Sequence, residues 1–352
     1  MARQVRDKTY RAARNVQPPS VFLLLSSAVR PLTSAFQLIS ALCVLSFVLC
    51  SAARAQEYPS QDLRFICAFP AGSGADVIVR YFAEKMRPLV KRTIIVENKP
   101  GAGGNIAAEY MVRAKPDGHT IFIHAGNTVA GNMHLIKKPP FDAAKAIQVA
   151  ATINKQAFML AVDAKRPWKT VAELTAYLKD KGDKASYAVS ANSGIVMGAI
   201  YKEKAGLQAV QVHYRMAQDA LNDMASGKID YALQDPVFAL SQMREGRLRI
   251  LAVASAERLK SNPELPTMTE SGIAMDLVGW FAAMVPSATP KPIVNQLNGW
   301  FSEIVASPET QVFLKNYGGD PWISSPEEGQ ARLIADIAAW GEYVRVAKLE
   351  PQ

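Results

Sequence analysis

Hydrophobic residues after Tyr58 fall into short runs that alternate with longer segments in which apolar residues recur every three or four positions. The short runs are rich in β-branched and aromatic residues and lack strict polar alternation, which is typical of strands covered on both faces. Ten strands are predicted, at residues 63–69, 94–96, 120–123, 149–153, 158–162, 186–189, 210–214, 229–233, 248–253 and 280–285.

Helices are expected between these strands, and several have chemical start signals. Thr170 and Ser325 are each followed three residues later by glutamate, which is the pattern of a capping box. Thr289 and Ser307 each precede a proline, which is tolerated in the first helical turn. The last helix carries an apolar stripe that must pack on a core, at Leu333, Ile337, Trp340 and Val344.

Repeated alternation of strand and helix predicts an α/β fold with parallel sheets. Ten strands exceed an ordinary open sheet, so two sheets in two lobes are expected, with a ligand cleft between the lobes. Apolar strands around Phe158 and Ile250 are the candidates for crossing from one lobe to the other. The predicted lobes are residues 56–157 together with 251–352, and residues 158–250.

The first 55 residues predict export. A basic start is followed by an uncharged, largely apolar run at residues 31–53 and then by Ala53-Arg54-Ala55, which is the order of a secretory signal. We therefore expect a signal peptide at residues 1–55, cleavage after Ala55 and a periplasmic protein. The alternative is a retained membrane anchor, because the 23-residue run is long enough to span a bilayer.

Charge and cysteine content narrow the possible functions. Seven basic residues and one acidic residue in 1–55 supply most of the formal charge of +9, and no basic cluster in the remainder suggests a nucleic-acid partner. Only Cys67 would remain after cleavage, so no internal disulfide is expected, and its apolar surroundings predict a small buried residue. The four histidines lack metal-pair spacing, and no nucleophile–base motif occurs, so we expect neither a metal nor an enzyme.

The loop after the first strand is a candidate anion site. It precedes a helix predicted at residues 77–87, where free backbone N–H groups and the positive helix end favour an anion. An ordinary glycine-containing turn explains the pattern equally well. The candidate residues of this loop are Phe69, Ala71, Gly72, Ser73, Gly74, Ala75 and Asp76.

A second glycine-rich loop, at residues 100–106, suggests a dinucleotide fingerprint. That fingerprint requires Gly or Ala where Ile106 stands, and no Walker lysine follows, so a structural turn is favoured. In the second lobe, three further loops follow strands, and ligands of open α/β sheets bind beyond strand carboxyl ends. The candidate ligand-binding residues there are Ser190, Asn192, Ser193, Gly194, Tyr214, Arg215 and Asp235.

Several short motifs in fixed order resemble the extracytoplasmic solute receptors of the tripartite tricarboxylate transporter system, the TctC or Bug family. The resemblance extends from Tyr58 to the C-terminus. The motifs include Phe69-Pro70-Ala71-Gly72 with Asp76, the segment Val96 to Asn105, Lys115-Pro116-Asp117-Gly118, Gly227-Lys228-Ile229-Asp230, Gly246-Arg247-Leu248-Arg249, and Pro266-Thr267 with Glu270-Ser271-Gly272.

The resemblance implies a two-lobed, type II periplasmic-binding-protein fold that closes around a small di- or tricarboxylate or aromatic acid. It also implies delivery to a membrane permease with large and small subunits of the TctA/TctB kind, with no cofactor and a monomeric receptor. Main-chain N–H groups and small hydroxyls would hold the carboxylate.

This chain departs from the family pattern in three places. Ser73 supplies the hydroxyl that usually precedes Asp76, the Ser190–Ile195 loop is short and lacks histidine, and Arg215-Met216 replaces a Lys-Gly-like pair. Two other hypotheses remain: an exported sensor that signals to a membrane kinase, and a Rossmann-type enzyme. Ile106 and the export signal argue against the enzyme.

Overall fold

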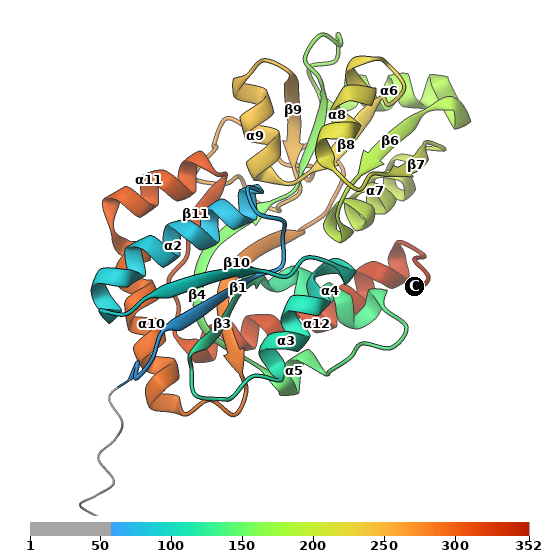
Figure 1. Cartoon of the computed structure of the whole chain (residues 1–352). Helices are drawn as coiled ribbons and strands as arrows, with labels where there is room; N and C mark the ends of the chain where they lie inside the picture. The colour runs from blue at the N-terminus through green and yellow to red at the C-terminus, as the bar shows by residue number, and fades with distance from the viewer. Residues whose placement is uncertain (1–57, 352) are drawn as a thin grey trace, which may run out of the picture. The chain divides into compact units, whose positions relative to one another are not determined.

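Two mixed sheets organise residues 58–351, which are the residues that this computed structural model describes (Figure 1). The predicted leader lies outside them. Sheet A, in the order β11-β4-β10-β3-β1-β2, contains β1 (Leu63–Cys67), β2 (Ile94–Asn98), β3 (Thr120–Ala125), β4 (Ile147–Ala157), β10 (Val278–Pro286) and β11 (Gly319–Pro321). Sheet B, in the order β7-β6-β8-β5-β9, contains β5 (Met159–Asp163), β6 (Ser186–Val189), β7 (Val210–His213), β8 (Tyr231–Gln234) and β9 (Leu248–Val253).

Helices connect and cover these strands. They are α2 (Gly74–Val90), α3 (Asn105–Val112), α4 (Gly126–Leu135), α5 (Ala143–Ala146), α6 (Val171–Lys181), α7 (Asn192–Ala205), α8 (Ala217–Ala225), α9 (Pro236–Arg244), α10 (Lys291–Ala306), α11 (Pro308–Asn316) and α12 (Pro326–Val346), with short 3₁₀ turns η1 (Ala102–Gly104) and η2 (Gly182–Lys184). Within residues 58–351, no helix has the length and hydropathy required to cross a bilayer.

All ten predicted strands are present, but the expectation of purely parallel sheets is wrong. β10 runs antiparallel to both β3 and β4, and β5 runs antiparallel to both β8 and β9. The reason is that β4 passes into β5 through Phe158 alone, so one extended run supplies a strand to each sheet. The chain returns from sheet B to sheet A between β9 and β10. The predicted lobe limits remain a prediction.

Most of the predicted helix starts are confirmed. Ser325 and Glu328 form a reciprocal capping box, and the hydroxyls of Thr170 and Ser307 accept from the N–H groups of the third helical residues. The predicted cap at Thr289 is wrong. Because α10 begins at Lys291 after Pro290, Thr289 lies one residue too early, and its buried hydroxyl has no hydrogen-bond partner among the described residues.

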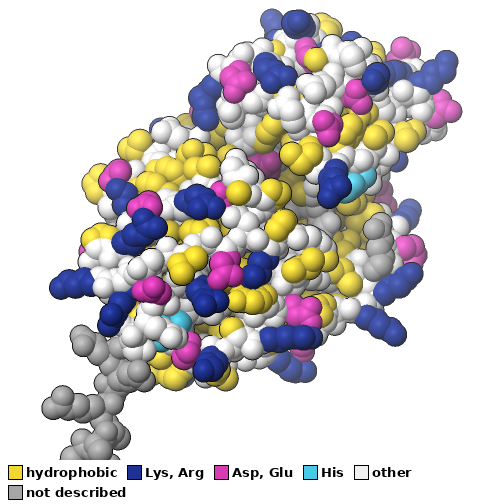
Figure 2. Space-filling view, viewed as in Figure 1, with side chains coloured by type: hydrophobic (Ala, Val, Ile, Leu, Met, Phe, Trp, Pro, Cys, Tyr) yellow, Lys and Arg dark blue, Asp and Glu magenta, His cyan; other side chains and the backbone are white. Residues whose placement is uncertain are grey.

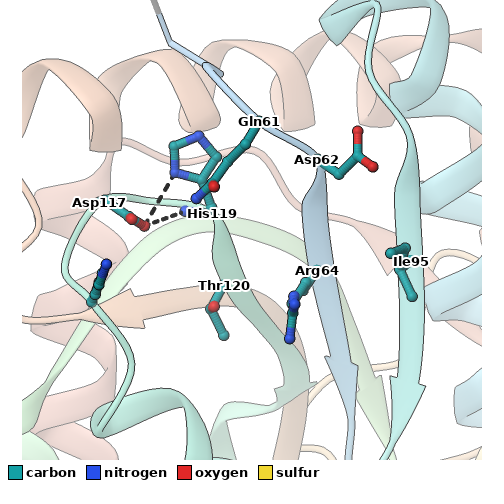
Figure 3. Close-up of a pocket in the computed structure, with 8 residues that line it drawn as sticks. Gln61, Asp62, Arg64, Ile95, Asp117, His119 and Thr120 are labelled. Atoms are coloured by element: carbon teal, nitrogen blue, oxygen red, sulfur yellow. Dashed lines mark hydrogen bonds and ion pairs between the residues drawn. The ribbon is translucent and has the colours of Figure 1, made fainter. Parts of the chain in front are cut away.

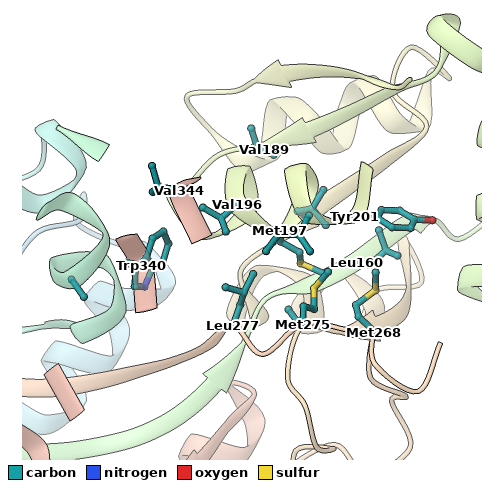
Figure 4. Close-up of a cluster of buried hydrophobic side chains, with 14 of the residues drawn as sticks. Leu160, Val189, Val196, Met197, Tyr201, Met268, Met275, Leu277, Trp340 and Val344 are labelled. Carbon is teal, nitrogen blue, oxygen red and sulfur yellow. The ribbon is translucent and has the colours of Figure 1, made fainter. Parts of the chain in front are cut away.

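One hydrophobic cluster extends from sheet A to sheet B. The stripe on α12 is core as predicted, with Leu333, Trp340 and Val344 buried. Figure 4 shows Trp340 and Val344 near Val196 of α7, with Met197, Met268 and Met275 gathered beside Leu160 and Leu277. Methionine is unbranched and adapts to irregular gaps. The junction between the sheets is therefore filled by side chains that tolerate repacking. Cys67 is fully buried, as expected.

Candidate functional site

The first predicted loop leads into α2, and its serine caps that helix. Ser73 Oγ accepts from the Asp76 N–H at 3.3 Å, and the Gly72 N–H donates to Asp76 Oδ2 at 2.8 Å. Gly72 has a φ of +80°, a conformation that favours glycine. The first N–H groups of a helix have no intrahelical acceptor. In the part of the chain that the structure describes, the N–H groups of Gly74 and Ala75 therefore remain available to an anion.

Asp76 is buried and braces this loop. Its Oδ2 also accepts from Arg80 Nε at 2.8 Å, and its Oδ1 accepts from Asn98 Nδ2 at 2.7 Å. Burial alone would raise the pKa of the Asp76 carboxyl, but the hydrogen bonds from Arg80, Asn98 and Gly72 outweigh it and leave the pKa below its usual value. Both carboxylate oxygens are occupied, so Asp76 positions the loop rather than offering a free charge.

The start of α2 lies against the start of α9. A Cβ added to Gly74 would fall 2.3 Å from Val237 Cγ1, so only glycine permits this approach. Asp235 caps α9, with its Oδ1 accepting from the Phe238 N–H at 3.0 Å. Burial raises the pKa of the Asp235 carboxyl, although backbone N–H groups counteract part of the effect. The structure thus brings the predicted residues Gly74 and Asp235 to neighbouring helix ends.

A second junction joins the starts of α4 and α7, and neither start has a side-chain cap. Asn127 Nδ2 donates to Ser193 Oγ at 3.0 Å, and Asn192 Nδ2 donates to Asn132 Oδ1 at 3.0 Å. Gly194 packs so closely that an added Cβ would meet the Leu233 carbonyl at 3.0 Å. The predicted residues Asn192, Ser193 and Gly194 therefore lie at the contact between elements of the two sheets.

The glycine-rich loop at residues 100–106 supports this junction. Gly101, Gly103 and Gly104 all have positive φ, and the Gly103 carbonyl accepts from Asn132 Nδ2 at 2.8 Å. Asn132 Nδ2 also donates to Asn105 Oδ1 at 2.9 Å. The loop has a structural role in the described chain, as the mismatch at Ile106 predicts.

The remaining predicted residues lie in the predicted loops but take no part in the two helix-start junctions described above. Ala71 and Gly72 are exposed, and Ser190 is half-buried after β6. The rings of Phe69 and His124 are tilted against each other, with their centroids 5.0 Å apart. The Tyr214 hydroxyl donates to Asp223 Oδ2 at 2.8 Å, so it is engaged within the sheet B region. Arg215 is exposed.

The sequence analysis did not identify four neutral side chains near the glycine-rich loop and the α4–α7 junction. These are Asn105, His124, Asn127 and Asn132. All four are buried, and His124 and Asn127 have polar atoms without a hydrogen-bond partner in the described structure. His124 precedes the end of β3, and Asn127 follows it. Applying the strand-end rule to the third predicted strand would have found these two residues.

A small cavity of about 20 Å³ lies beside the α4–α7 junction, with Asn127 and Ser193 in its wall. This volume is about that of one water molecule. Arg332 and Asp336 of α12 also line the cavity, and their Nε and Oδ1 atoms lie 2.8 Å apart, so their charges are compensated. In residues 58–351, no three His, Cys, Asp or Glu side chains are grouped to hold a metal ion.

Two other surfaces offer no clear ligand chemistry. A depression of about 690 Å³ lies at the amino ends of β1 and β3, where His119 Nδ1 lies 3.1 Å from Asp117 Oδ1 (Figure 3). Its lining mixes both charge signs, with Asp62 and Arg64 on β1 or just before it. On the face in Figure 2, Lys and Arg are likewise interspersed with Asp and Glu.

Comparison with known proteins identifies the family. A family model described as "Tripartite tricarboxylate transporter family receptor" matches residues 78–348. The chain belongs to this family. The resemblance inferred from the sequence motifs is therefore confirmed, and this TctC/Bug-type chain has relatives that are solute-binding receptors.

Relatives of this TctC-family chain match along most of their length. A UPF0065 protein of Bordetella bronchiseptica is 29% identical over 303 residues, which are 85% of this chain and 90% of that protein. The periplasmic binding protein BugD has a TM-score of 0.75 and 28% identity, over 84% of this chain and 100% of BugD. R. palustris Rpa4515 with adipate has a TM-score of 0.78 and 26% identity, with the same coverage of 84% and 100%. The predicted periplasmic-binding-protein fold is confirmed.

Proposed function

We propose that this chain captures a small organic carboxylate in the periplasm and delivers it to a tripartite tricarboxylate-type permease with TctA/TctB-like subunits. The family match over residues 78–348 carries this proposal, and the adipate complex of a relative with 26% identity supports a carboxylate ligand. The mature receptor begins at Gln56 after cleavage behind Ala55, acts as a monomer and performs no chemical step.

The start of α2 is the proposed carboxylate site. The N–H groups of Gly74 and Ala75 point out of the first helical turn, where the helix dipole also favours an anion. The Gly72 N–H already donates to Asp76 and the Ser73 N–H to the Pro70 carbonyl, so within the candidate loop the proposed contact is limited to the N–H groups of Gly74 and Ala75. A charge-assisted hydrogen bond contributes roughly 1.5–3 kcal/mol, and micromolar binding needs about 8 kcal/mol, so further contacts are required.

The α4–α7 junction supplies those further contacts in the proposal. Asn127 and Asn132 approach Ser193 and Asn192, so a ligand between the sheets would meet groups from both. Ligand capture would then favour the arrangement in which these helix starts lie together, because binding stabilises the conformation that makes more contacts.

The ligand test combines native mass spectrometry with calorimetry. The mature protein is released from the periplasm under native conditions, and the mass of any co-purifying molecule is determined. Purified protein is then titrated with mono-, di- and tricarboxylates and aromatic acids. Saturable binding of a carboxylate supports the proposal, whereas binding confined to sugars, cations or amines contradicts it. Delivery is tested by uptake of the identified ligand in a strain that lacks this gene.

A proline substitution tests the backbone donor. Ala75→Pro removes one N–H at the second position of α2, a position that Pro292 occupies in α10 of this chain. We expect roughly tenfold weaker carboxylate binding, because one charge-assisted hydrogen bond is lost. Ala172→Pro is the matched control, since Ala172 is the second residue of α6, which follows β5. Equal loss in both variants would contradict the assigned contact.

A further inference from the structure

The end of the last helix, α12, lies against a helix of the other sheet. α12 packs on α4 and on β4 of sheet A, whereas α7 packs on β6 and β8 of sheet B, and the two helices contact each other. Val344 near the end of α12 and Val196 of α7 are buried in one hydrophobic cluster, and Figure 4 shows them close together. The C-terminal residues therefore leave α12 at the seam between the two sheets.

After α12 the chain turns back on itself in a Schellman motif. The Lys348 N–H donates to the Arg345 carbonyl and the Leu349 N–H to the Val344 carbonyl, both at 3.1 Å. Lys348 has a φ of +50° at the position where this motif usually has glycine, so the backbone there is strained and other contacts must hold it. Leu349 is half-buried and packs against the cluster that extends from sheet A to sheet B. The turn thus presses one apolar side chain onto the seam.

Two observations place this turn beside the C-terminal half of α7. Lys348 Nζ lies 3.9 Å from Glu203 Oε1 of α7. A groove of about 440 Å³ is lined both by Ala199 of α7 and by residues 346–349. The side chains of Lys348 and Glu203 are largely exposed, so their ion pair alone contributes little. The packing of Leu349 is therefore the main attachment.

α7 is held at two separate places. At its start, Ser193 Oγ accepts from Asn127 Nδ2 of α4 at 3.0 Å, and near its end Glu203 lies beside the C-terminal turn. These two residues are ten positions apart in α7, which is about 15 Å along a helix. A receptor that closes around its ligand opens by moving one part as a rigid body. Rotation of α7 about either attachment separates the other, so both must yield when the two sheets move apart.

We infer that residues 347–351 form a strap that holds α7 against α12 and limits how often the α4–α7 junction separates. The inference deepens the proposed function, on which its role in ligand exchange rests. A ligand enclosed between the sheets leaves only when they separate, so the strap slows release in proportion to the opening that it suppresses. Leu349 is the residue of the strap that carries this effect.

Thiol labelling measures the opening of the junction without a ligand. Ser193→Cys places a thiol where the native side chain is 4% exposed, and Cys67, the only cysteine among residues 56–352 of the natural sequence, is fully buried in sheet A. The labelling rate at position 193 reports separation of α4 from α7, and the rate at Cys67 reports unfolding. Adding Leu349→Ala should raise the rate at position 193 roughly three- to tenfold, because apolar contact at the seam is lost, and leave the rate at Cys67 unchanged.

Ile334→Ala, in the same Ser193→Cys protein, is the matched control. Ile334 lies on α12 with half of its surface exposed, so its truncation should change neither rate. An unchanged rate at position 193 in the Leu349→Ala protein overturns the inference. An equal rise at both thiols also overturns it, because Leu349 then stabilises the whole fold. No ligand enters this measurement, so its failure leaves the proposed function standing, whereas a failure of every carboxylate to bind refutes the proposed function and leaves the strap intact.

Discussion

Replacing Asp76 with asparagine should destabilise the loop before α2. The carboxylate accepts from the Gly72 N–H and Arg80 Nε, both at 2.8 Å, and from Asn98 Nδ2 at 2.7 Å. In Asp76→Asn, one carboxylate oxygen becomes an amide nitrogen, which cannot accept a hydrogen bond. This nitrogen faces either the Gly72 N–H and Arg80 Nε or, after a flip of the amide, Asn98 Nδ2. The variant therefore loses at least one hydrogen bond and the charge assistance of the others.

The expected loss of stability is about 2–4 kcal/mol. Hydrogen bonds to a charged group contribute roughly 1.5–3 kcal/mol each and neutral ones roughly 0.5–1.5 kcal/mol, and the share of Arg80 is discounted because its side chain is 49% exposed. For a protein of this size the melting temperature should fall by roughly 3–7 °C. Calorimetric melting at pH 7 measures this, with Asp180→Asn on the exposed face of α6 as the control.

The effect of Asp76 also depends on pH in a defined direction. Hydrogen bonds lower the pKa of the folded carboxyl despite its burial, so the stabilisation is fully present above the unfolded pKa of about 3.9. It is lost as the pH falls through the lower folded value. The difference between wild type and Asp76→Asn should thus be constant from pH 8 to about 5 and shrink below about 4. A difference under 1 kcal/mol at pH 7, or one that persists undiminished in acid, would refute this account.

Three further substitutions test other parts of the structure. Asp230→Asn should lower the unfolding free energy by about 3–5 kcal/mol, because buried Asp230 accepts from Lys181 Nζ at 2.6 Å and from the Ser186 N–H at 2.9 Å. Urea denaturation measures this, and a variant as stable as wild type would contradict it. Gly126→Ala should lower the unfolding free energy by about 1–3 kcal/mol and change tryptophan fluorescence, because the new Cβ would lie 2.3 Å from Trp280. Gly299→Ala on α10, where an added Cβ meets open space, is the control and should be neutral or stabilising. Equal effects of the two substitutions would be inconsistent with this packing. His124→Phe should remove one contribution to the pH dependence of the unfolding free energy. The pKa of His124 is about 3 in the folded protein and about 6.5 in the unfolded chain, so only the unfolded chain gains this proton as the pH falls from 7 to 5. Wild type therefore loses about 2 kcal/mol of stability from this group over that range. Urea denaturation at both pH values measures the difference, and equal losses in wild type and variant would argue against the buried neutral imidazole.

The sequence predicts the order of strands and helices well because local signals specify them. Ser325 begins α12 through its own side chain, and the apolar stripe from Leu333 onward specifies which face packs. Strand direction is different, since it depends on how distant segments pair. The single residue Phe158 between β4 and β5 links the two sheets, and nothing local reveals that β10 will pair antiparallel to β4. β11 was missed because Gly319-Asp320-Pro321 reads as a turn and becomes a strand only beside β4.

The candidate site is harder to predict for the same reason. Asn132 belongs to the middle of α4, and only the fold brings it to Gly103 and to Asn192 of α7. Tyr214 follows a strand, as the strand-end rule requires, but its hydroxyl donates to Asp223 instead of facing the other sheet. A rule about strand ends predicts only which edge of a sheet a ligand would approach. It does not identify which side chains at that edge are already paired.

The motifs of the family resemblance mainly brace the fold, and this determines where ligand specificity can arise. Asn98, within the Val96–Asn105 motif, donates to Asp76 Oδ1 at 2.7 Å and to the Phe69 carbonyl at 2.9 Å, so one motif fixes another. Asp230 ties β6 to α6, and Thr267 and Glu270 cap each other through 2.8 and 2.9 Å hydrogen bonds. Groups that are satisfied internally cannot distinguish one acid from another. In the proposed site, discrimination would come from groups that have no partner among the described residues, such as the N–H groups of Gly74 and Ala75 and Asn127 Oδ1.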